Sequence, residues 1–148
     1  ARSGASDSLR VARTSSHALA SQQEDCLGHD IPPGEQIEAG FEVDAKGALR
    51  CKSAGQVQPL VNGVAAFRLR YRVRQGEQVR DLSAGDVEAA KLWPAVVAVE
   101  VCLDLQGDVR ASAYEGRYTD CQGQRTSNGG WLHLVTRKLF LLQAPVGG

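Results

Sequence analysis

The sequence predicts a mostly antiparallel β domain with one short helix. Two long stretches, residues 64–74 and 95–106, alternate between apolar and polar side chains. A period of two is typical of strands that have one buried and one solvent-facing side. Only one segment, at residues 86–92, has the pattern of a helix. The chain of 148 residues is long enough for one hydrophobic core, so we expect a single globular domain over residues 1–148.

The first third of the chain is predicted to contain a short strand, a loop and a hairpin. Residues 8–13 alternate and indicate the strand, whereas a Pro-Pro-Gly sequence within residues 28–36 indicates the loop. Residues 41–44 and 48–51 alternate on either side of a glycine-containing turn. This spacing predicts a β-hairpin with Gly47 at a backbone position of positive φ.

The alternating stretch at residues 64–74 places apolar side chains on one face and arginines on the other. The arginine face has two interpretations: a solvated face paired to carboxylates of neighbouring strands, or a docking stripe for an acidic partner. We expect the first, with Glu100 and Asp104 as partners if the two long strands are neighbours. The apolar residues are Phe67, Leu69, Tyr71 and Val73, and the arginines are Arg68, Arg70, Arg72 and Arg74.

The second half of the chain is predicted to contain the helix and two further strands. Asp86 is expected to be the N-cap of the helix, which Pro94 ends. In residues 95–106 one face is apolar and the other carries polar residues, and a turn follows at Gly107. Residues 109–126 contain at most a weak strand. The apolar face holds Val97, Val99, Val101, Leu103 and Leu105, and the polar face holds Glu100, Cys102 and Asp104.

The last predicted strand, residues 131–142, is apolar on both faces near its end. Such a strand is expected to be central in its sheet or covered on both sides. The two apolar faces of the long strands also need a cover, because each large side chain left in water forgoes about 1.5–3 kcal/mol. We therefore expect that the sheet closes on itself, or that the covering element lies outside this sequence.

Four widely spaced cysteines, with no Cys-x-x-Cys, favour two disulfides in an oxidising compartment over a zinc site. The alternative is four reduced core residues in a cytosolic protein. Four cysteines allow three connectivities. We predict Cys26–Cys51, which bracket one loop and hairpin, and Cys102–Cys121, because the glycine-bearing segment around Cys121 can fold over the polar side of the strand that carries Cys102.

The composition excludes several classes of function. The 17 basic and 17 acidic residues balance, which argues against nucleic acid as the main partner. No catalytic motif, phosphate loop or paired carboxylates are found, and we expect no enzyme activity, metal or cofactor. The three histidines, His17, His29 and His133, are expected to be solvated. Neither a signal peptide nor an apolar run of membrane-spanning length is found. Because methionine is absent, we expect a processed piece of a longer precursor, with any anchor before Ala1.

The order of four short segments is informative. Asp25-Cys26-Leu27-Gly28 comes first, then Leu49-Arg50-Cys51, then Gln58-Pro59-Leu60-Val61-Asn62-Gly63-Val64, and last Trp93-Pro94-Ala95-Val96-Val97-Ala98-Val99. This order, over roughly residues 8–105, resembles the C-terminal domain of PilW-type minor pilins of the type IV pilus. The resemblance in the last strand, at Val135-Thr136-Arg137-Lys138-Leu139-Phe140, is partial.

The resemblance implies an α+β, pilin-like fold, in which a long N-terminal helix, here truncated, begins in the inner membrane and packs on the sheet. The cleavage motif and apolar helix of the family are absent from this sequence. It implies a minor pilin that initiates or caps pili through other minor pilins or a tip adhesin, and so serves cell adhesion and twitching motility. The protein would lie in the periplasm and at the cell surface. Residues 109–130 would form its variable contact surface.

Two alternatives to the minor pilin remain. The pseudopilins of type II secretion share the pilin fold and differ in their partners, and the sequence separates the two families poorly. The second alternative is a secreted β-rich module that binds glycans or a cell surface. Such a module needs exposed aromatic side chains, and Trp131, beside two glycines, is the one candidate. A core role for Trp131 is the other interpretation.

Overall fold

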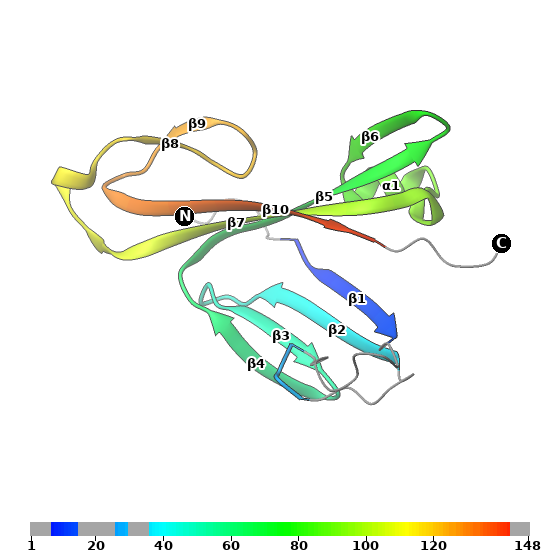
Figure 1. Cartoon of the computed structure of the whole chain (residues 1–148). Coiled ribbons are helices and arrows are strands. Elements are labelled where there is room, and N and C mark those ends of the chain that lie inside the picture. Colours follow the sequence, from blue (N-terminus) through cyan, green and yellow to red (C-terminus); the bar gives the residue numbers. More distant parts are fainter. Residues whose placement is uncertain (1–6, 15–25, 30–35, 143–148) are drawn as a thin grey trace. The chain divides into compact units, whose positions relative to one another are not determined.

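A computed structural model describes residues 7–14, 26–29 and 36–142 (Figure 1). The chain divides into two compact units, Ala1–Ala65 and Ala66–Gly148. The expectation of a single domain over residues 1–148 stays a prediction. The predicted loop at residues 28–36 falls largely on residues 30–35, which lie outside the described residues.

The first unit contains one antiparallel sheet whose four strands follow one another in sequence order. Its second and third strands form the predicted hairpin, and Gly47 has a φ of 84° in the turn. The turn is held by Asp44, whose Oδ1 accepts hydrogen bonds from the backbone N–H groups of Lys46 and Ala48, both at 2.9 Å. The strands are β1 (Leu9–Thr14), β2 (Gln36–Val43), β3 (Leu49–Ser53) and β4 (Gln56–Val61).

The second unit contains a four-stranded antiparallel sheet in the order β10-β7-β5-β6 and a separate two-stranded hairpin, β8–β9 (Figure 1). The hairpin and short helical segments connect the long strands. The sheet strands are β5 (Val64–Gln75), β6 (Gln78–Leu82), β7 (Val96–Arg110) and β10 (Trp131–Leu141). The remaining elements are α1 (Ala84–Ala89), η2 (Trp93–Ala95), η3 (Ser112–Tyr114), β8 (Arg117–Thr119) and β9 (Arg125–Ser127).

The apolar row of β5 is buried, as the alternation predicted. The four side chains from Phe67 to Val73 have at most 7% of their surface exposed. Part of the cover comes from the helical segment of the same unit, because the ring of Trp93 meets Tyr71 edge-to-face with 5.1 Å between centroids. Val87 of α1 is fully buried. The helix begins at a different cap than expected, since Ser83, and not Asp86, is the N-cap and its Oγ accepts from the Asp86 N–H.

Strand β7 is longer than predicted, and both of its faces are buried in part, with Val99 of the predicted apolar face at 5% exposure. It continues through Gly107, where a turn was expected, to Arg110. Cys102 and Asp104, on the face predicted to carry polar residues, are each only 2% exposed, whereas Val101, Leu103 and Leu105 are partly exposed. The reason is that the polar face is covered by the β8–β9 hairpin, which Figure 1 shows alongside the β10–β7 pair.

Among the described strands β10 is at the edge of its sheet, so the expectation of a central or doubly covered strand was wrong. Its end is apolar on both faces and yet exposed, with Leu139 at 44%, Phe140 at 48% and Leu141 at 80%. Because burial was inferred from composition alone, the free edge was missed.

The expected α+β, pilin-like fold class was also wrong. The described residues form three antiparallel sheets, and their one α-helix, α1, has six residues. Across those residues, no helix has the length and apolar character needed to cross a bilayer. The architecture is β-rich, and the part of the expectation that held is the mostly antiparallel sheet with one short helix.

Candidate functional site

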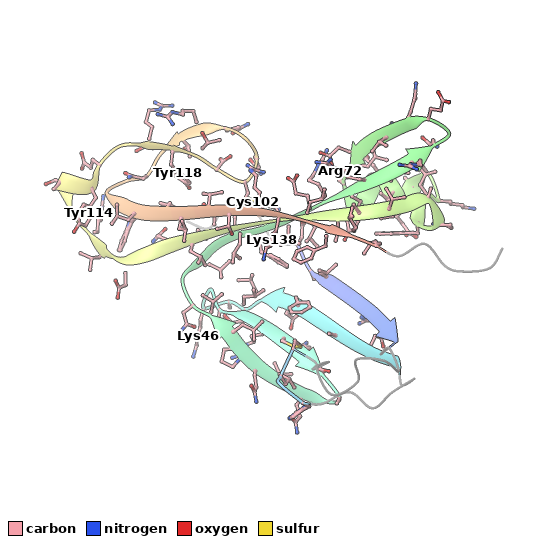
Figure 2. All side chains as sticks on the ribbon, in the orientation of Figure 1. Lys46, Arg72, Cys102, Tyr114, Tyr118 and Lys138 are labelled. Atoms are coloured by element: carbon pink, nitrogen blue, oxygen red, sulfur yellow. A yellow bond between two sulfur atoms is a disulfide. The ribbon has the colours of Figure 1, made fainter. Side chains whose placement is uncertain are left out.

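A buried polar cluster lies between the β8–β9 hairpin and the β7–β10 pair. Asp104 on β7 is its centre, with one carboxylate oxygen 2.7 Å from Nδ1 of His133 on β10. The other carboxylate oxygen accepts the hydroxyl of Tyr118 on β8 at 3.1 Å. Figure 2 shows Tyr118 between its hairpin and the β10–β7 pair. We call these three residues the Asp104 cluster.

The Asp104 cluster is desolvated, and this determines its chemistry. The side chains of His133 and Asp104 are 6% and 3% exposed. The ring of Tyr118 stacks on the imidazole of His133 with 4.1 Å between centroids. Burial, followed by the charge of Asp104 and the hydrogen bond to it, raises the pKa of Tyr118 to about 12. Tyr118 is therefore a neutral hydrogen-bond donor at neutral pH.

Covalent and polar contacts hold the hairpin over this cluster. Cys121, in the β8–β9 turn, forms a disulfide with Cys102 of β7, with 5.7 Å between the Cα atoms. Arg137 of β10 donates from Nη2 to the carbonyl oxygen of Asp120 at 2.7 Å and from Nη1 to that of Cys121 at 3.4 Å. The Asp120 carboxylate accepts the backbone N–H groups of Gln122 and Gln124 and so stabilises the turn.

The arginine face of β5 is paired with carboxylates in part as predicted. Nη2 of Arg72 lies 3.4 Å from Glu100 on β7, and Nη1 of Arg137 lies 3.6 Å from the other oxygen of the same carboxylate. Arg70 pairs with Asp81 of β6 at 3.4 Å. Asp104, the second expected partner, is directed instead to His133 and Tyr118. Of the other two predicted interaction-face residues, Arg68 is partly exposed and Arg74 is exposed.

Both predicted disulfides are confirmed. Cys26 is joined to Cys51 on β3, with 6.2 Å between the Cα atoms, and Cys102 is joined to Cys121. None of the four cysteines is free. The two bridges indicate an oxidising, extracytoplasmic compartment.

His133 was expected to be solvated, but its side chain is 6% exposed and contacts Asp104. His17 lies outside the described residues. One signal was present in the sequence: Asp104 interrupts a strand of valines and leucines, and a carboxylate in such a strand needs partners if it is buried. Its partners are 14 and 29 positions away, so only the folded chain identifies them.

The arrangement has the properties of a structural cluster. Both carboxylate oxygens of Asp104 are occupied by partners within the protein. Among the described residues, every buried side-chain nitrogen or oxygen has a hydrogen-bond partner. The same part of the chain holds no group of three or more His, Cys, Asp or Glu side chains that suits a metal ion.

Comparisons with family models, curated proteins and solved structures gave no match. The resemblance to minor pilins therefore rests on the quoted segments.

Proposed function

We propose that this chain is a structural subunit without enzyme activity, a minor pilin that initiates or caps type IV pili through contacts with other minor pilins. The observation that carries the proposal is the order of the four PilW-like segments. The first two of them, Asp25-Cys26-Leu27-Gly28 and Leu49-Arg50-Cys51, are joined by the Cys26–Cys51 disulfide. The proposal concerns the role of the chain, and its fold is the β-rich one described here.

The chemistry of the described residues supports a structural role. In the Asp104 cluster each carboxylate oxygen has an internal partner, and the Asp104 side chain is only 3% exposed. Glu100 is likewise shared by two arginines. In contrast, the apolar end of β10 is exposed, which suits protein contacts better than small-molecule chemistry.

In this proposal the subunit is held at the inner membrane before assembly and reaches the periplasm and cell surface as part of the pilus. Its partners are other minor pilins and a tip adhesin, and it needs no cofactor. Residues 109–130 are the proposed variable contact surface. They include the β8–β9 hairpin, where Arg117 and Arg125 are exposed, and loops of this kind commonly carry specificity.

The test is deletion of the full-length gene in its own host, followed by complementation. We expect fewer surface pili and reduced twitching motility, both restored by the wild-type gene. The purified protein should capture other minor pilins in a pull-down and show no hydrolase or transferase activity. Secretion through the type II system, measured in the same strain, serves as the control.

Three results would change the assignment. Normal piliation with loss of type II secretion would favour the pseudopilin alternative. Specific binding on a glycan array, with no capture of pilins, would favour the surface-binding module. Normal piliation, motility and secretion in the deletion strain would contradict the proposal.

A further inference from the structure

The free edge of β10 presents a regular row of backbone hydrogen-bonding groups. The strand is the last in the order β10-β7-β5-β6, and β7 is its one neighbour among the described strands. Leu142 donates its N–H to the carbonyl oxygen of Val97. In an antiparallel pair alternate residues bond to the same neighbour, so even-numbered positions face β7. The groups that face outward belong to Val135, Arg137, Leu139 and Leu141.

Apart from two cations, Arg137 and Lys138, this edge lacks the usual devices that prevent strand pairing. Natural edge strands are commonly short, bulged or interrupted by proline and charge. Strand β10 has 11 residues and no proline, and its one register irregularity lies between Trp131 and His133, at its start. Beyond that point the exposed side chains include Leu134, at 60%, and the apolar end of the strand.

The charges on β10 are both positive. Arg137 is turned toward Glu100 and the β8–β9 turn. Lys138 is on the other face of the strand, pairs in register with Val101 and is exposed, and Figure 2 shows it on the side of β10 opposite the hairpin. Strand β10 carries no carboxylate. A second copy of β10 would therefore bring cations and no complementary charge.

We propose that the free edge of β10 accepts an antiparallel strand from another subunit, and that this strand is apolar at alternate positions with a carboxylate near Lys138. Main-chain hydrogen bonds supply the affinity in such strand addition, and the side chains supply the selectivity. The identity of the partner as a pilus subunit rests on the proposed function, whereas the acceptance of a strand is a property of the purified protein.

The test uses fluorescent, capped peptides of alternating threonine and valine with one central glutamate or one central lysine. Binding to the full chain is measured by anisotropy. The glutamate peptide should bind about fivefold more tightly than the lysine peptide, as expected for one exposed cross-strand ion pair. Lys138→Glu should invert this preference. Lys91→Glu makes the same charge change at an exposed position outside β10 and should leave the preference unaltered.

A third peptide separates strand addition from a general affinity for apolar sequences. Consecutive residues of a strand direct their backbone N–H groups to opposite edges. N-methylation of consecutive central residues therefore removes N–H donors from both edges of the peptide, and this peptide should not bind. Circular dichroism of each variant checks that the sheet is retained. The proposal is overturned if no peptide binds, if the methylated peptide binds equally, or if Lys138→Glu leaves the preference unchanged. It is also overturned if β10 pairs with a second copy, seen as a concentration-dependent dimer that the glutamate peptide does not dissociate.

Failure of the proposed function gives a different pattern. Normal pili in the deletion strain, together with charge-selective peptide binding, would keep the strand-accepting edge and remove the pilus as its setting. Loss of pili together with no peptide binding would keep the minor pilin and place its contacts elsewhere.

Discussion

Tyr118 combines a buried hydrogen bond with ring stacking, and the two can be separated by one substitution. Tyr118→Phe keeps the stacking on His133 and removes the hydrogen bond to Asp104. We expect a loss of about 1–3 kcal/mol in urea unfolding, because a buried acceptor is left with fewer partners. Tyr114→Phe is the control, since Tyr114 is 41% exposed, and should change stability by less than about 0.5 kcal/mol. Equal effects at both sites would contradict the buried cluster.

The raised pKa of Tyr118 also predicts the alkaline limit of stability. The folded state keeps the phenol neutral, with a pKa of about 12 against a usual value of 10.0. The stabilisation is fully present below pH 10.0 and is lost as the pH rises from there toward about 12. Unfolding midpoints measured across this range should fall for the wild type. They should fall less steeply for Tyr118→Phe, and a parallel decline of both proteins would contradict this prediction.

The lowered pKa of Asp44 predicts that its contribution to stability is lost at low pH, whereas that of Tyr118 is lost at high pH. The backbone N–H of Ala48 is the main cause of its lowered pKa, with further contributions from Lys46 N–H and Arg50, while desolvation opposes them. A lowered folded-state pKa gives stability above the unfolded value of 3.8, which is lost as the pH falls through the folded-state value. Asp44→Asn should therefore flatten the acid limb of the unfolding curve. Asp108→Asn, at an exposed position, is the control, and identical acid limbs for both variants would rule out the role of Asp44.

At the scale of the strands, two arginines pair with Glu100 but differ in their other contacts, so the stability losses on replacing each can be compared. Arg72 makes a partly exposed ion pair, so Arg72→Gln should cost at most about 1 kcal/mol. Arg137 also donates to two carbonyl oxygens of the β8–β9 turn, and Arg137→Gln should cost about 1.5–3 kcal/mol. Thermal and urea unfolding measure both. A loss of several kcal/mol at Arg72 would mean that the arginine face is buried.

At the scale of the whole molecule, each compact unit has its own disulfide. Cys26–Cys51 closes a loop within Ala1–Ala65, and Cys102–Cys121 closes one within Ala66–Gly148. Replacing either pair by alanine should destabilise its own unit by about 3 kcal/mol, since loops of these lengths constrain the unfolded chain to that extent. Native-state hydrogen exchange should show increased exchange in one unit and little change in the other. Equal losses in both units would show that they unfold as one.

Local rules were enough to predict several features of this protein. The period of two identified the buried row of β5 and the hairpin around Gly47, because side-chain direction alternates in any strand and positive φ favours glycine. The disulfide pairing also followed from short separations, 25 and 19 residues. These features depend on residues that are close in the chain, so they could be predicted without the fold.

Which surfaces are covered depends on how distant segments of the chain fold together. The side of β7 that carries Cys102 and Asp104 is buried because a distant hairpin folds over it, although its residues are polar. Strand β10 is apolar and remains exposed because it has no neighbour on one side among the described strands. The α+β expectation came from the resemblance of short segments, and such segments do not determine which element covers the sheet. Burial depends on contacts between distant segments, and no local pattern encodes them.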